Sequence, residues 1–347
     1  MRMQPENQDS RGLAGLYIHV PFCARKCWYC DFYSTTDVNR AEAFLRGLEK
    51  EMALVDEPAM VFDTIYLGGG TPSVLDDLHV GRIIETAMGC FAVSVESEIT
   101  VEANPGTLSP KGVRSWLARG INRVNLGIQS FRDEHLQFLG RIHSAEEARQ
   151  AIRTAREAGV VNLGLDLIYG LPNQTAKEWL EDLKEAIRHR PEHLACYMLT
   201  YEKGTPLERW CCQGRFKALP EDAVRDLFDL TVAFLEAMGY EQYEISNFSR
   251  GEAFRSKHNQ KYWHHTSYIG LGPSAHSFLQ SRRSWNYADL DAYMRALETG
   301  ILPVQDAELL DRHQLMLETV FLGLRTVQGI DADLFWEQYG IDFMDFF

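Results

Sequence analysis

Three cysteines lie close together near the start of the chain, in the stretch HVPFCARKCWYCDFYS. They are Cys23, Cys27 and Cys30, with the spacing C-x3-C-x2-C. A structural zinc site or an ordinary iron–sulfur cluster usually takes four protein ligands, so this group is one ligand short. A zinc site completed by His19 or Asp31 is one possibility. Zinc sites usually pair cysteines as C-x2-C with a second pair farther along, and because no such pair follows, the pattern argues against zinc.

The composition of the whole chain limits the function classes that remain. The chain has 347 residues, 45% of them hydrophobic, with a formal net charge of −14 and seven cysteines. An acidic chain lacks the dominant basic surface that nucleic acids and anionic lipids require. It contains no apolar run of roughly 18 residues and no signal-peptide core. We therefore expect a cytoplasmic protein with no nucleic-acid partner and no membrane insertion, whose clustered thiols bind a metal or take part in redox chemistry.

Apolar, β-branched segments alternate with helical patterns along the first part of the chain. This alternation is typical of βα units that build a parallel sheet covered by helices. The six predicted strands span residues 13–20, 64–70, 98–105, 123–130, 162–170 and 193–201. Helix-capping signals lie between them. They are Ser109–Pro110 with Gly120, the pair Ser144 and Glu147, and the pair Thr175 and Glu178.

The chemically distinctive residues follow the predicted strands at their C-terminal ends, where parallel barrels bind ligands. Six βα units make an incomplete (β/α)6 barrel that is open on one side. We predict a polar N-terminal extension over residues 1–12, the barrel over 13–203, and a mainly helical C-terminal region over 204–347 against the open side. The aromatic ending FWEQYGIDFMDFF predicts that the chain stops inside a small terminal domain.

The cysteine spacing, on a loop after the first strand, resembles the radical S-adenosylmethionine (radical SAM) superfamily. In that superfamily three thiolates hold three irons of a [4Fe–4S] cluster, and S-adenosylmethionine chelates the fourth iron. The resemblance implies both cofactors here, with Cys23, Cys27 and Cys30 as the metal ligands. The cofactors bring one-electron chemistry, and the protein supplies geometry. The loop GGGTP, from Gly68 to Pro72, resembles the superfamily's GGE-like motif, which binds the methionine amino group.

This GGGTP variant is similar to the branch that contains oxygen-independent coproporphyrinogen III oxidase, over roughly residues 13–278. The resemblance implies that nine residues contact S-adenosylmethionine. They are Tyr17, Tyr29, Gly69, Gly70, Thr71, Glu102, Gln129, Arg141 and Asp166. Taken singly, each has a structural alternative: the glycines could form an ordinary turn, the two carboxylates could be buried structural pairs, and Arg141 could be solvated.

Two features distinguish the members of this branch. In the oxidase a fourth cysteine comes two residues after the third, whereas here Cys30 is followed by Asp31 and Phe32. The stretch HNQKYW matches the HNxxYW signature of the heme chaperones called HemW. The resemblance therefore implies a protein that binds heme and passes it to an apoprotein. Its expected heme-binding residues are His258, Asn259, Tyr262 and Trp263.

The chemistry of this motif suits heme, because imidazole can ligate iron and aromatic faces can cover the macrocycle. Arg255, Lys257 and Lys261 could pair with the propionates. The alternative is that the histidine and its aromatic neighbours only pack against one another in a loop.

The sequence leaves open whether the protein dimerises and whether it turns over S-adenosylmethionine. An oxidase that decarboxylates coproporphyrinogen III and a tRNA-modifying enzyme are the other function classes, although the latter predicts a basic domain that is not seen. The histidines that could contact iron are His258, His264, His265 and His276.

Overall fold

The computed structural model describes residues 13–346, so the predicted N-terminal extension over residues 1–12 lies outside the described part. Six parallel strands form the centre of the sheet in sequential order, which confirms the six predicted strands. They are β1 (Ala14–Val20), β2 (Val61–Gly69), β3 (Ala92–Ala103), β4 (Arg123–Gln129), β5 (Leu163–Tyr169) and β6 (His193–Met198).

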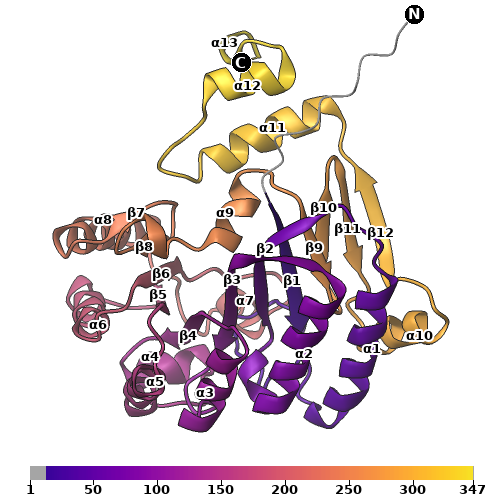
Figure 1. Cartoon of the computed structure of the whole chain (residues 1–347). Helices are drawn as coiled ribbons and strands as arrows, with labels where there is room; N and C mark the ends of the chain where they lie inside the picture. Colours follow the sequence, from indigo (N-terminus) through magenta and orange to yellow (C-terminus); the bar gives the residue numbers. More distant parts are fainter. Residues whose placement is uncertain (1–12, 347) are drawn as a thin grey trace, which may run out of the picture.

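Helices lie around the outside of this curved sheet (Figure 1). The first six are α1 (Ala41–Leu54), α2 (Asp77–Cys90), α3 (Pro110–Ala118), α4 (Asp133–Leu139), α5 (Ala145–Ala158) and α6 (Ala176–Arg188). The predicted caps form: the side chain of Ser109 accepts from the Gly112 amide, and both capping boxes are present, at the starts of α5 and α6. Each cap satisfies backbone N–H groups that would otherwise lack partners.

The C-terminal region is richer in helix than in strand, and it also extends the sheet at both edges. Its helices are α7 (Pro206–Cys212), α8 (Glu221–Ala237), α9 (Lys257–Trp263), α10 (Leu290–Glu298), α11 (Arg312–Gly323), α12 (Ala332–Tyr339) and α13 (Phe343–Phe346). Its strands are β7 (Glu241–Gln242), β8 (Asn247–Ser249), β9 (Tyr268–Leu271), β10 (His276–Leu279), β11 (Arg282–Asn286) and β12 (Val304–Leu309). Strand β9 pairs in parallel with β1, and β8 pairs antiparallel with β6.

A buried carboxylate joins α1 to the C-terminal region. Glu51 is 2% exposed and accepts hydrogen bonds from the Gly272 amide at 2.8 Å, from Asn286 Nδ2 at 2.6 Å and from the Tyr293 hydroxyl at 2.6 Å. Burial raises the pKa of Glu51 to about 7, although the three donors oppose the shift. Glu51 thus joins α1 to residues 272–293, which are more than 200 residues away in the sequence.

Replacing Glu51 with alanine should lower the free energy of unfolding by about 3–5 kcal/mol, because three buried donors would lose their acceptor. Chemical denaturation of the two proteins measures this difference. The exposed Glu57, just after α1, provides the control, and Glu57→Ala should change stability by less than about 0.5 kcal/mol. Equal, small effects of the two substitutions would contradict the joining role of Glu51.

Candidate functional site

The cysteine loop follows β1, at the C-terminal end of the parallel strands. Cys23, Cys27 and Cys30 are free thiols that line one cavity, and the Cys23 amide donates to the Thr35 carbonyl at 2.9 Å to close the loop. Among the described residues, no group of three or more His, Cys, Asp or Glu side chains is arranged to hold a single metal ion. A [4Fe–4S] cluster places each cysteine on a different iron, so its ligands need not converge on one point.

The glycine loop after β2 lies directly against the cysteine loop. The Gly70 amide donates to the Val20 carbonyl at 2.9 Å, and the Thr71 amide donates to the Phe22 carbonyl at 2.7 Å. A Cβ atom on Gly70 would lie 2.6 Å from that same carbonyl oxygen, so only glycine fits without moving the backbone. The hydroxyl of Thr71 lies 3.5 Å from Cys23 Sγ. The GGGTP sequence therefore positions the first cysteine.

Arg141 follows α4 and reaches back to the second cysteine. Its Nη1 donates to Cys27 Sγ at 3.5 Å, while Nη2 donates to the Gly127 carbonyl at 2.7 Å and to Asn104 Oδ1. The solvated alternative for Arg141 does not match this arrangement. A guanidinium group beside a sulfur atom stabilises negative charge on that sulfur, and the thiolate is the form of cysteine that binds metals.

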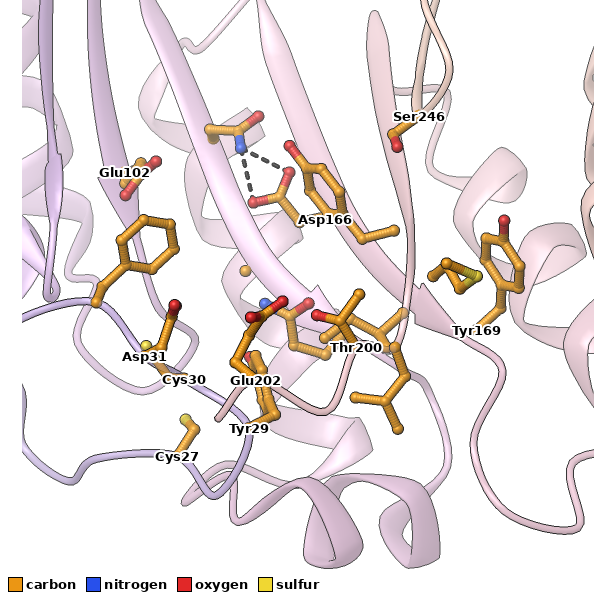
Figure 2. Close-up of a pocket in the computed structure, with 18 of the residues that line it drawn as sticks. Cys27, Tyr29, Cys30, Asp31, Glu102, Asp166, Tyr169, Thr200, Glu202 and Ser246 are labelled. Carbon is orange, nitrogen blue, oxygen red and sulfur yellow. Dashed lines mark hydrogen bonds between the residues drawn. The ribbon is translucent and has the colours of Figure 1, made fainter. Parts of the chain in front are cut away.

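Two carboxylates face the cavity from β3 and β5, which lie on either side of β4, as Figure 2 shows. The Tyr66 hydroxyl donates to Glu102 Oε1 at 2.7 Å, and Asn125 Nδ2 donates to both oxygens of Asp166 at 2.7 and 2.8 Å. Burial raises the pKa of Glu102 to about 7 and that of Asp166 to about 6, and the mutual repulsion of the two carboxylates contributes to the shift of Glu102. Both groups therefore change charge near neutral pH.

Of the nine residues expected to contact S-adenosylmethionine, eight line this cavity. They are Tyr29, Gly69, Gly70, Thr71, Glu102, Gln129, Arg141 and Asp166. Tyr17 does not line it. The Tyr17 ring stacks on Tyr66 at a centroid distance of 6.2 Å, and its hydroxyl lies 3.1 Å from His19 Nδ1, so it supports the wall from behind.

Sequence reasoning missed several side chains of the wall, including Tyr66, Asn104 and Asn125. The sequence did contain a signal for Asn125. In β4, Asn125, Gly127 and Gln129 are spaced two residues apart, and all three line the cavity. Successive side chains of a strand point to opposite faces, so residues two apart share a face. The period of two therefore identifies Asn125 once Gln129 is assigned to the interior.

The HNxxYW motif lies on α9, and among its signature residues only Asn259 lines the cavity. His258 is 1% exposed; its Nδ1 lies 2.7 Å from the Thr64 hydroxyl and its Nε2 lies 2.9 Å from the Tyr262 hydroxyl. Its ring stacks on Tyr66 at 5.0 Å. Burial lowers the pKa of His258 to about 3, so the imidazole is neutral. In this arrangement both ring nitrogens already have partners within the protein.

Other residues around the motif also have partners of their own. His265 Nε2 lies 3.0 Å from Glu318, and the ring of His276 stacks on Trp285 at 5.8 Å. The three basic residues expected to meet propionates also have other partners: Arg255 pairs with Glu241, Lys257 Nζ donates to the Glu96 carbonyl, and Lys261 pairs with Asp63. None of these three basic side chains lines the cavity. The expectation that they bind propionates is not supported by this geometry.

Comparison with known proteins places this site in a family. The model of the radical SAM superfamily matches residues 17–186, and that of the HemN C-terminal domain matches residues 310–347. The heme chaperone HemW of Bacillus subtilis is 33% identical over 93% of this chain and 86% of its own length. The chain belongs to the HemW family of the radical SAM superfamily. The resemblance inferred from the cysteine spacing, GGGTP and HNxxYW is confirmed.

Further relatives agree with this membership. The heme chaperone HemW of Escherichia coli is 37% identical over 75% of this chain and 69% of its own length. The solved structure of the coproporphyrinogen III oxidase HemN from Escherichia coli has a TM-score of 0.82 and 24% identity, and the match covers 97% of this chain and 80% of HemN. At that identity the likeness shows the fold alone, and it confirms the predicted α/β radical SAM fold. Among residues 13–346, no helix is long and apolar enough to cross a membrane.

Proposed function

We propose that this protein is a cytoplasmic heme chaperone, which binds heme and transfers it to an apoprotein. The observation that carries the proposal is its membership of a family whose relatives in Bacillus subtilis and Escherichia coli are named heme chaperones. The residues Asp31 and Phe32 after Cys30 support it, because the oxidase resemblance requires a further cysteine at position 32. The alternative is oxidative decarboxylation of coproporphyrinogen III.

We further propose that Cys23, Cys27 and Cys30 hold a [4Fe–4S] cluster with S-adenosylmethionine at its open iron. Three free thiols on one loop, beside a guanidinium group and a loop that excludes a Cβ atom, fit such a cluster. When bound, the cluster supplies one-electron chemistry. The chain's own residues supply position and charge: Gly70 fixes the cysteine loop, and Arg141 offsets negative charge on sulfur.

The two buried carboxylates give the binding of S-adenosylmethionine a pH dependence. The ligand carries positive charge, which ionised Glu102 and Asp166 attract and protonated ones do not. Because their pKa values are raised to about 7 and 6, affinity should be full near pH 8 and fall about tenfold by pH 5.5. Anaerobic calorimetric titration of the reconstituted protein measures this, and Glu102→Gln should bind more weakly with a flatter profile. A constant affinity from pH 8 to 5.5 would contradict the assignment.

Heme binding is tested by titrating the reconstituted protein with heme and following the Soret band. We expect saturation at one heme per chain, with the sulfide content of the cluster unchanged. Bound heme should then leave the protein when an apo-form of a heme protein is added. A protein that retains its cluster and S-adenosylmethionine but does not take up heme would overturn the proposed function.

A further inference from the structure

The cavity is larger than one cofactor site requires. Its volume is about 1170 Å³, whereas pockets for single small molecules usually have about 300–1,000 Å³. The residues expected to contact S-adenosylmethionine come from β1 to β5 and their loops. The cavity continues past them to β6, α8, the segment 245–259 and Arg325. In Figure 2, Ser246 of this far part lies on the opposite side of the view from Cys27 and Cys30.

One wall of the far part is apolar and open to the cavity. Tyr197, Met198 and Ile245 line the cavity and are 42%, 49% and 43% exposed, and Val224 and Phe228 of α8 line the same space. Large apolar side chains left exposed in a concave site usually mark a surface that a ligand covers. The ligand that fits this wall has a broad apolar face.

Positive charge lies beside the apolar wall. Arg325 lines the cavity; its guanidinium carbon lies 4.5 Å from the centre of the Trp263 ring, and its Nε has no hydrogen-bond partner among the described residues. Arg123 also lines the cavity, and it donates to two neutral acceptors, Asn162 Oδ1 at 3.2 Å and the Phe254 carbonyl at 3.0 Å. The carboxylate of Glu244 attracts Arg325, and the carboxylate of Asp166 attracts Arg123.

Buried polar atoms without partners add to this site. His193 and Asn247 are 2% and 3% exposed and line the cavity, yet His193 Nδ1 and Asn247 Oδ1 have no hydrogen-bond partner within residues 13–346. Buried polar atoms in folded proteins are nearly always satisfied, by protein, water or ligand. The far part thus combines an apolar face, guanidinium groups and unsatisfied polar atoms.

We infer that heme occupies this far part of the cavity, with its ring against Tyr197, Met198 and Ile245 and a propionate on Arg325. The inference rests on the proposed heme binding and adds its location. A porphyrin has a flat apolar face and two carboxylates at one edge, and a guanidinium group binds a carboxylate with two parallel hydrogen bonds. In this arrangement the motif residue Trp263 acts indirectly, by holding the guanidinium group of Arg325 on its ring face.

The first test removes, in turn, each partner of the proposed ion pair, which are the guanidinium group of Arg325 and the heme propionates. Arg325→Gln should weaken heme binding about tenfold, and heme dimethyl ester, which lacks the carboxylates, should bind the unmodified and Arg325→Gln proteins with equal affinity. Arg114→Gln, at an exposed position on α3, is the matched control and should bind heme normally. Cluster content and S-adenosylmethionine affinity should be unchanged in both variants.

The second test blocks the apolar wall and does not depend on Arg325. Met198→Trp should reduce heme affinity at least tenfold, whereas Met88→Trp, at a residue of α2 that is also 49% exposed, should leave it unchanged. If the protein binds heme but Met198→Trp and Arg325→Gln bind it normally, heme lies elsewhere and the inference is overturned while the proposed function stands. If the unmodified protein binds no heme, the proposed function itself fails.

Discussion

Cys27→Ser should abolish the iron–sulfur cluster of the anaerobically reconstituted protein. A serine hydroxyl does not replace a thiolate as an iron ligand, and two remaining cysteines cannot hold three irons of the cluster. The broad absorption near roughly 400 nm, which arises from thiolate-to-iron charge transfer, should disappear. Iron and sulfide content should fall to background.

The control for this substitution is Cys90→Ser. Cys90 is exposed at the end of α2 and does not line the cavity, so its removal should leave the absorption and the iron content unchanged. Full cluster content in Cys27→Ser would contradict the assignment of the three cysteines as cluster ligands. Loss of the cluster in both variants would point to a general instability of the protein.

Gly70→Val should be nearly as damaging, although it removes no ligand. The new side chain would press on the Phe22 carbonyl, where even a Cβ atom would lie at 2.6 Å, and would displace the cysteine loop. We expect S-adenosylmethionine affinity to fall at least tenfold and the free energy of unfolding to fall by about 1–3 kcal/mol. Calorimetric titration and chemical denaturation measure the two effects.

Gly89 provides the matched glycine control. It lies in α2, and a Cβ atom placed on it meets no atom within 4 Å. Gly89→Ala should therefore leave binding unchanged and stabilise the helix by about 0.4–1 kcal/mol. If Gly70→Val behaved like Gly89→Ala, the glycine loop would have no role in positioning the cysteines.

Local patterns predict the six central strands, because each is an apolar run followed by a helical pattern, and capping signals mark the helices between the third and the sixth strand. The strands added by the C-terminal region are two to six residues long, and the two that join the central sheet pair with distant partners. Strand β9 pairs with β1 across about 250 residues of sequence. The hydrophobic periodicity of a short segment does not predict such a pairing, because tertiary contacts determine it.

The candidate site likewise contains some residues that the sequence predicts and others that only the fold brings there. The three cysteines lie on one loop, so their spacing alone indicates the chemistry. Arg325 reaches the cavity from beyond α11, and nothing in its neighbourhood in the sequence marks it. His258 shows the opposite case: its motif is plain in the sequence, but the direction of its side chain, toward Thr64 and Tyr262, depends on the fold.

The most direct test of the central claim compares heme with coproporphyrinogen III. The reduced, reconstituted protein is incubated anaerobically with S-adenosylmethionine and coproporphyrinogen III, and a parallel sample is titrated with heme. We predict one heme bound per chain and no protoporphyrinogen IX. Protoporphyrinogen IX, formed with consumption of S-adenosylmethionine, would contradict the account and identify a biosynthetic oxidase instead.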